Sequence, residues 1–323
     1  MCVGGGFPII RTRFVGGVSD GQYGSVHMDT ATHNLTAKRS WYFYDDAIIA
    51  LASDLTLTTR TTAWTALASR LLPTGQITIG FFNSTIRTLQ DGNYSFPYVQ
   101  NKTSNVQWIH VGESDIGYLL QVQQKYASLE VQVGMKTGDY RTIGPSNYTV
   151  TARMLTLAIN HGVGPYTLDY NYMILPNVSL ESIPRLIKQY DEEQVFACIS
   201  NAGNSQGTVW PSLKRAMFVL WDDNVTTFSC QSPLFEINIR FTRSGTYIFS
   251  ETATDFTLTA SHYKRYNYTV NAIVDRVGYG EGCSTISSYL DATQTNMTTR
   301  LPPTREWLGA SVNVTCKKST IMN

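Results

Sequence analysis

The chain has 323 residues, enough for two domains and a substantial core, and 42% of them are hydrophobic while only 15% are charged. This composition excludes an intrinsically disordered chain and a coiled coil. The 25 basic and 24 acidic residues leave a formal charge of +1, so no global field draws the chain to nucleic acid or to an anionic membrane. No run approaches the roughly 18 consecutive apolar residues of a membrane helix, so we expect no membrane span.

Short segments rich in β-branched and aromatic residues follow one another along most of the chain, with turn clusters between them. Several alternate apolar and polar side chains, as in residues 151–158, which is the pattern of antiparallel strands with one buried face. The sequence therefore predicts an all-β fold of large antiparallel sheets. The predicted strands are residues 40–44, 47–51, 76–82, 106–111, 129–133, 148–159, 169–175, 195–199, 216–221, 235–241 and 246–249.

One helix is predicted, between residues 182 and 193. Ser182 suits the N-cap, Pro184 suits the first turn, and an acidic run at 191–193 ends the segment. The apolar residues of the segment recur along one helical face: Ile183, Leu186, Ile187 and Tyr190. Near residue 240 the strands become shorter and richer in Thr and Tyr. We therefore expect a large β-domain over residues 1–242 and a small C-terminal β-sandwich over residues 243–323.

The chain carries many potential N-glycosylation sites. Ten Asn-X-Ser/Thr sequons occur, whereas chance predicts about three or four. The excess favours a eukaryotic secretory protein, and the alternative is that a β-protein rich in Thr and Asn generates sequons incidentally. Residues 1–8 show no signal peptide, so we expect a fragment or a truncated gene. The sequons begin at Asn34, Asn83, Asn93, Asn101, Asn147, Asn177, Asn224, Asn267, Asn296 and Asn313.

Five cysteines occur without a CxxC pair, which disfavours a zinc ribbon or a thioredoxin-like site. In an oxidising compartment we expect Cys283 to pair with Cys316 and Cys198 with Cys230, leaving Cys2 free. Free buried thiols are the alternative.

Six segments form a recognisable set: residues 14–24, 35–46, 48–51, 161–162, 165–166 and 170–177. In their order and spacing they resemble the central β-domain of the polysaccharide lyases that act on hyaluronan, chondroitin and xanthan. The resemblance implies a large antiparallel β-supersandwich followed by a smaller antiparallel β-sandwich, with a short helix between them. The resemblance covers essentially the whole chain, but beyond about residue 240 it rests on the general pattern of short strands and not on matching motifs.

In this family the chemistry is β-elimination at a uronic acid, in which a base removes the C5 proton while donors neutralise the adjacent carboxylate. The resemblance implies that Asn, His, Tyr and Arg for this chemistry come from an α-helical toroid upstream of the β-domain. None of the matching helical motifs occurs in this chain, so none of those residues is carried over and we expect the chain alone to be inactive. The resemblance also implies that the β-domain adds an acidic residue that steadies the arginine. Residues 23–29 contain no Glu, which leaves Asp29 as the catalytic candidate.

Two further residues are candidates for the carbohydrate cleft. Asp20 lies in the glycine turn, and His161 lies in the His-Gly motif, where a structural turn histidine is the alternative. His27, Asp29 and His33 raise the question of a metal site, but a surface strand that leads into a loop is the favoured interpretation. We expect no cofactor.

The sequence thus predicts the β-domain portion of a secreted, extracellular polysaccharide lyase. The expected partners are an acidic, glycosaminoglycan-like polysaccharide and the upstream helical domain of the same parent chain. Two alternatives remain: a non-catalytic carbohydrate-binding module, and a structural secreted β-protein that retains only the fold.

Overall fold

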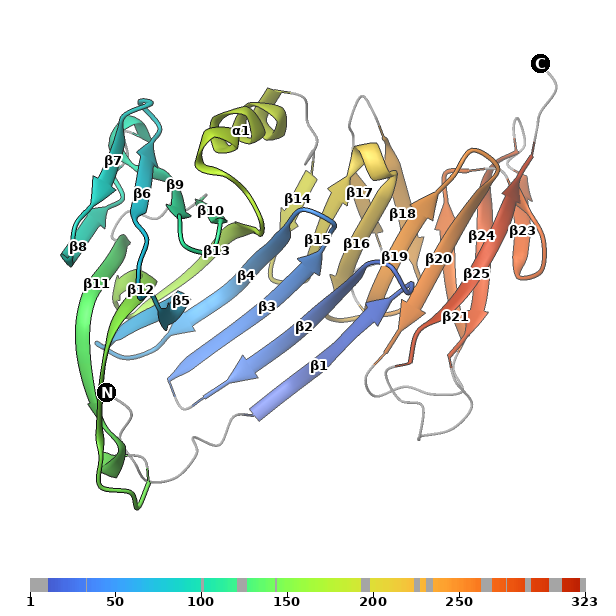
Figure 1. Cartoon of the computed structure of the whole chain (residues 1–323). Helices are drawn as coiled ribbons and strands as arrows, with labels where there is room; N and C mark the ends of the chain where they lie inside the picture. Colours follow the sequence, from blue (N-terminus) through green and yellow to red (C-terminus); the bar gives the residue numbers. More distant parts are fainter. Residues whose placement is uncertain are drawn as a thin grey trace. The chain divides into compact units, whose positions relative to one another are not determined.

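Strands dominate the computed structural model of the chain (Figure 1). It describes residues 11–32, 34–99, 102–120, 127–142, 144–192, 198–223, 227–230, 235–262, 269–276, 278–287, 292–301 and 310–319. The chain folds into two compact units: the first includes Ala31–Thr36 and Leu55–Ile183, and the second includes Thr12–Thr30, Ala37–Asp54 and Pro184–Asn323. In the described part of the chain, no helix is long and apolar enough to cross a membrane. The predicted all-β fold is confirmed.

The first unit contains two antiparallel groups of strands, with the orders β13-β10-β9-β6-β7 and β5-β12-β11-β8. In the second group, Val131 pairs with Leu157 and Leu129 with Ile159, and all four side chains are buried on one face. The bounds are β5 (Thr62–Leu71), β6 (Ile77–Phe81), β7 (Ile86–Leu89), β8 (Gly92–Pro97), β9 (Val106–Val111), β10 (Ile116–Leu120), β11 (Ser128–Asp139), β12 (Thr149–Val163) and β13 (Tyr166–Leu175).

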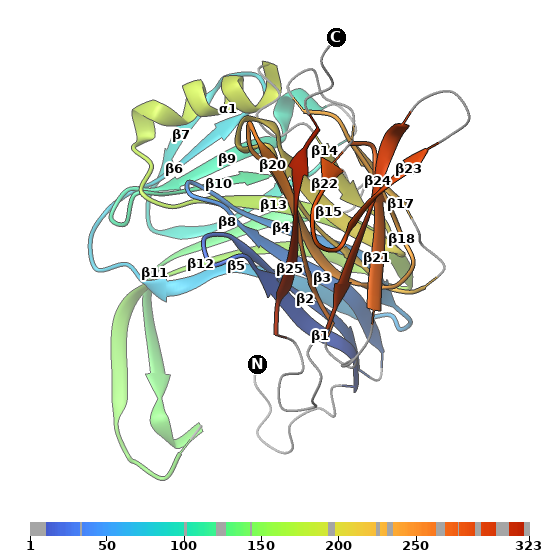
Figure 2. The ribbon, with the colours of Figure 1, turned by 90° about the vertical axis from the view of Figure 1, so that its right-hand side faces the viewer.

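The hairpin of β11 and β12 extends beyond its neighbours as a two-stranded ribbon (Figure 2). The register of β8 on β11 ends at Val133, and that of β5 on β12 ends at Met154, whereas β11 and β12 stay paired to Asp139 and Thr149. Near the tip, the rings of Tyr140 and Tyr148 stack with 5.0 Å between their centroids. This ribbon therefore depends on its own cross-strand contacts.

The second unit contains most of β1 to β4, hydrogen-bonded in that order, and a sandwich of two sheets with the orders β14-β15-β16-β19-β20-β25-β22 and β17-β18-β21-β24-β23. The first four strands are β1 (Arg11–Ser19), β2 (Gly24–Ala31), β3 (Leu35–Phe43) and β4 (Ile48–Leu57). The sandwich strands are β14 (Cys198–Asn201), β15 (Ser205–Trp210), β16 (Arg215–Leu220), β17 (Thr227–Cys230), β18 (Ile237–Phe241), β19 (Gly245–Glu251), β20 (Asp255–Ser261), β21 (Thr269–Val274), β22 (Gly278–Tyr279), β23 (Cys283–Ser287), β24 (Ala292–Arg300) and β25 (Val312–Lys318).

Aromatic side chains fill the sandwich core. Phe218 stacks on Phe228 with 4.3 Å between ring centroids, and Phe241 lies 4.2 Å from Tyr247 by the same measure. The close packing requires glycine at position 207, because a Cβ there would lie 2.4 Å from the Phe228 ring and 2.6 Å from the Phe218 Cβ. The packing of Phe218 against Phe228 thus depends on the absence of a side chain at position 207.

The expected domain boundary at residues 242/243 does not coincide with a division in the structure. Strand β16 pairs with β19 and β18 pairs with β21, so each sheet combines a block of strands that precede residue 242 with a block of strands that follow it. The shorter strands and the higher Thr and Tyr content beyond residue 240 therefore mark a change in strand composition and not a change of domain. The sandwich begins at β14, immediately after the helix region.

The predicted helix is confirmed as α1 (Ile183–Glu192). Ser182 ends a short 3-10 turn that precedes it, and the Ser182 hydroxyl donates to the carbonyl oxygen of Ser179 at 2.8 Å. Ile183 is fully buried at the first position of the helix. The 3-10 helices are Lys102–Ser104, Tyr140–Thr142, Leu180–Ser182 and Pro211–Leu213.

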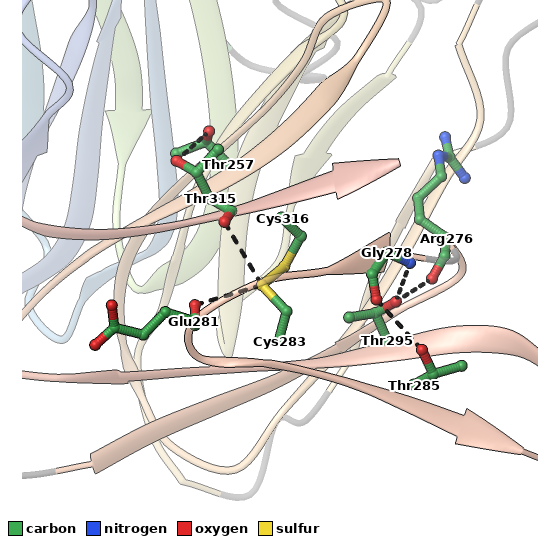
Figure 3. The surroundings of a disulfide bond; sticks show 9 residues. All are labelled: Thr257, Arg276, Gly278, Glu281, Cys283, Thr285, Thr295, Thr315 and Cys316. Carbon is green, nitrogen blue, oxygen red and sulfur yellow. Dashed lines mark hydrogen bonds between the residues drawn. A yellow bond between two sulfur atoms is a disulfide. The ribbon is translucent and has the colours of Figure 1, made fainter. Parts of the chain in front are cut away.

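A disulfide joins Cys283 of β23 to Cys316 of β25, the pairing expected from the sequence (Figure 3). Beside it, the Thr295 hydroxyl donates to the carbonyl oxygen of Arg276 at 2.7 Å and accepts the Gly278 N–H at 2.8 Å. The bond links the two sheets of the sandwich near its C-terminal end. The side chains of Cys198 and Cys230, and all of Cys2, lie outside the described part of the chain.

Candidate functional site

Asp20 organises the turn between β1 and β2. Its Oδ1 accepts the backbone N–H groups of Gln22 at 3.1 Å and Tyr23 at 2.8 Å, and Gly21 takes a φ of 94°, which favours glycine. These bonds make Asp20 the acceptor that closes the hairpin turn.

Arg215 at the start of β16 meets this turn. Its Nη1 donates to Asp20 Oδ2 at 2.5 Å, and its guanidinium lies 4.0 Å from the centroid of the Tyr23 ring. The Tyr23 hydroxyl donates to Asp45 Oδ2 at 2.7 Å; burial raises the pKa of Tyr23, and the bond to Asp45 raises that pKa further. Both oxygens of Asp20 therefore have partners. Sequence reasoning identified Asp20 but not Arg215, because nothing in the sequence indicates a partner so distant along the chain.

His27 lies on β2 with its ring buried. Its Nδ1 is 2.9 Å from Ser40 Oγ and its Nε2 is 2.8 Å from Ser25 Oγ, so both ring nitrogens are hydrogen-bonded. Burial lowers the pKa of His27 to about 3, which keeps the ring neutral near pH 7. In this arrangement neither nitrogen is directed at a metal or a substrate. Asp29 lies half-buried two residues further along the same strand.

Through Ser40, His27 is connected to a buried network of hydrogen-bonded polar side chains. Ser40 Oγ donates to Gln206 Oε1 at 2.5 Å, and Gln206 Nε2 donates to Ser53 Oγ at 3.1 Å and to Asn201 Oδ1 at 2.8 Å. These residues come from β3, β4, β14 and β15, and Gln206 is fully buried. The network holds strands of the N-terminal segment against the sandwich within the second unit.

His161 lies in the first unit, near the end of β12. Its ring is buried, its Nε2 is 2.8 Å from Thr65 Oγ1, and its centroid is 4.8 Å from that of Tyr170. Gly162 follows with a φ of 82°, and a cis peptide joins Gly164 to Pro165. The histidine thus belongs to a strand and not to a turn, and its ring lies on the covered face of the sheet.

The remaining sequence candidates occupy separate places. Among the described residues, no group of three His, Cys, Asp or Glu side chains is arranged to hold a metal, and His33 lies outside them. Asn296 is half-buried in β24. The sequon residues Asn101, Asn224 and Asn267 lie outside the described residues, whereas the exposed ones are Asn34, Asn83, Asn93, Asn147, Asn177 and Asn313.

Comparisons with known proteins agree on one kind of domain. Residues 7–187 match the family model described as polysaccharide lyase family 8, super-sandwich domain. The chain is 27% identical over 218 residues to xanthan lyase of Bacillus sp. (strain GL1), covering 64% of this chain and 22% of that protein. It is 24% identical over 265 residues to hyaluronate lyase HylB of Enterococcus faecalis, covering 79% of this chain and 25% of that protein.

The fold gives the same result. The structure of Paenibacillus xanthan lyase superimposes with a TM-score of 0.74 at 20% identity, covering 95% of this chain and 29% of that one. The chain therefore spans about a quarter of the length of the relatives that it matches.

Proposed function

Because the chain belongs to polysaccharide lyase family 8, we propose that it is the β-domain portion of a secreted enzyme that cleaves uronic-acid-containing polysaccharides of the hyaluronan and chondroitin type by β-elimination. The observation that carries the proposal is the family match over residues 7–187. The fold likeness, which extends to 95% of the chain, supports it. The relatives described above are a xanthan lyase and a hyaluronate lyase, which supports an acidic polysaccharide as the substrate class.

The proposed reaction needs groups beyond those that the described residues bring together. Removing the C5 proton requires a base with donors aimed at the developing negative charge. Of the described candidates, His27 and His161 are buried and hydrogen-bonded, and Asp20 is bound to Arg215. We therefore assign the base and the carboxylate-neutralising groups to a helical domain of the parent chain. The present chain forms one wall of the cleft, and Asp29 remains the candidate for orienting an arginine of that domain.

Two features support secretion as part of this proposal. The Cys283–Cys316 disulfide is a bond that persists in oxidising compartments, and six sequon asparagines are exposed. An extracellular location is also where an acidic polysaccharide substrate is accessible to an enzyme.

The proposal is tested by following the unsaturated uronate product in the ultraviolet. The purified chain and a gene product extended upstream to include a helical domain are each incubated with hyaluronan, chondroitin sulfate and xanthan. We expect product from the extended protein alone. Robust turnover by residues 1–323 would overturn the assignment of the catalytic groups to another domain. Failure of the extended protein on all three polysaccharides would overturn the lyase proposal itself.

A further inference from the structure

The outer face of the sheet β5-β12-β11-β8 presents an exposed tryptophan. Trp64 on β5 is 53% exposed, whereas its neighbours Ala63 and Thr65 are buried on the opposite face. Side chains alternate between the faces of a strand, so Trp64 lies on the face opposite the buried Leu157 and Ile159 of β12. An exposed indole on the outer face of a sheet offers a stacking surface that the core does not use.

Polar and small side chains share this outer face with Trp64. In the register of the sheet, Trp64 pairs with Asn160, which pairs with Ser128. At the next outward-facing step Ala66 pairs with Ala158, and Ala158 pairs with Glu130. Trp64 and Glu130 thus lie two strand spacings apart on adjacent outward-facing steps, a diagonal of about 12 Å, with Asn160 and Ala158 on the strand between them. This width leaves room for a pyranose ring.

The carboxylate of Glu130 gives the face its charge. Glu130 Oε1 accepts the hydroxyls of Ser95 at 2.7 Å and Ser128 at 2.5 Å. The nearest described cation along the strand, Lys136, donates its Nζ to Gln132 at 2.8 Å and to Thr156 at 3.2 Å. Among the paired residues of these two rows, which are Trp64, Asn160 and Ser128 and then Ala66, Ala158 and Glu130, only Glu130 carries a formal charge. Such a surface repels an anionic sugar and accepts hydrogen bonds from hydroxyl groups.

We propose that this face binds an uncharged polysaccharide, with the apolar face of one sugar ring stacked on the Trp64 indole and hydroxyls of the chain donating to Glu130. The carboxylate of Glu130 accepts hydrogen bonds, and the ligand carries many hydroxyl donors and no negative charge that this carboxylate would repel. The ligand class therefore differs from the acidic polysaccharide of the proposed lyase reaction. Sequence spacing does not reveal the site, because Trp64, Glu130 and Asn160 come together only through the strand register.

The test is affinity electrophoresis of the whole chain in gels that contain mixed-linkage β-glucan, galactomannan or hyaluronan. We expect retardation by at least one of the two neutral polysaccharides, unchanged at high salt, because no ion pair is formed. Trp64→Ala should weaken the binding by about tenfold and Glu130→Gln by a smaller factor. The matched control is Phe82→Ala, which removes another exposed aromatic ring of the same unit and should migrate like the wild type.

The proposal is overturned if neither neutral polysaccharide retards the chain, if Trp64→Ala is retarded like the wild type, or if only hyaluronan retards it and salt abolishes the effect. Circular dichroism of each variant establishes that it is folded before it is compared. The readout is binding and not turnover, so its failure leaves the lyase proposal untouched, and failure of the lyase proposal leaves this one untouched.

Discussion

Arg215 and Asp20, 195 positions apart in the sequence, form an ion pair in which Nη1 lies 2.5 Å from Oδ2, and their side chains are only 14% and 16% exposed. Asp20→Ala removes both this pair and the acceptor that closes the β1–β2 turn. We expect it to lower the free energy of unfolding by roughly 2–3 kcal/mol. Asp20→Asn keeps the turn acceptor and should cost about 1 kcal/mol. Urea unfolding of both variants measures the difference; equal losses would contradict the two separate roles.

His27 makes stability depend on pH. Burial lowers the pKa of His27 to about 3 from an ordinary value of 6.5, so below pH 6.5 the unfolded chain binds a proton that the folded chain does not. The contribution of neutral His27 to the free energy of unfolding is therefore complete above pH 6.5. It is lost as the pH falls below 6.5, by up to about 1.4 kcal/mol per pH unit. Between pH 7 and pH 5, we expect the wild type to lose about 2 kcal/mol more than His27→Gln does. Parallel stability curves for the two proteins, measured by urea unfolding, would rule this out.

Two glycines form a matched pair for testing the sandwich core. Gly207→Ala places a Cβ 2.4 Å from the Phe228 ring, and we expect it to destabilise the chain by about 2–3 kcal/mol. At Gly138, in the β11–β12 ribbon, an added Cβ meets nothing within 4 Å, and Gly138→Ala should change stability by less than about 0.5 kcal/mol. Denaturant midpoints of the two variants provide the comparison, and the expected ranking fails if Gly207→Ala unfolds like the wild type.

The disulfide closes a loop with a sequence separation of 33. Replacing both cysteines, Cys283→Ala with Cys316→Ala, should lower the free energy of unfolding by about 3–4 kcal/mol because the unfolded chain gains loop entropy. Peptide mapping without reduction should recover the linked peptides from the wild type. A double variant that unfolds at the wild-type denaturant concentration would show that the bond adds no stability.

Two sequons with different surroundings test glycosylation. Asn83 is exposed in the turn after β6, where its Oδ1 accepts the Thr85 N–H at 3.0 Å, whereas Asn296 is half-buried between β21 and β23. When the protein is expressed in a eukaryotic host and secreted, we expect a glycan on Asn83 and none on Asn296. Mass spectrometry after glycosidase treatment reads both positions, and Asn83→Gln is the control for assigning the peptide. Full occupancy of Asn296 in folded protein would contradict the expectation.

Residue pattern predicted the apolar strands well and the polar strands poorly. The segment 106–111 coincides with β9 because four of its six side chains are apolar and the strand is buried. Strand β15, with the sequence SQGTVW, was not predicted, although all six of its residues are buried. Its polar side chains are buried because Gln206 is hydrogen-bonded to Ser40 and Ser53, and no local pattern indicates such distant partners.

The candidate residues show the same limit. Asp20 and His27 were selected by residue type, but their surroundings depend on Arg215 and Ser40, which only the fold brings to them. The surface around Trp64 is the clearest case, since dispersed positions in the sequence become neighbours through strand register. The sequence thus identified residues of suitable chemistry, but it did not predict the contacts between distant residues that determine what each of them does.

Each sheet of the sandwich joins strands from before and after residue 242 by one strand pair, and this arrangement determines how the chain tolerates cleavage. In a fragment of residues 243–323, β19 and β21 would lose β16 and β18, and with them the hydrogen-bonding partners along one side. Bare strand edges of this kind recruit other chains, so such a fragment is prone to aggregate rather than to fold. A protease that cuts in the segment between β18 and β19 would therefore sever the covalent link while the two pieces remained held together by the sheets.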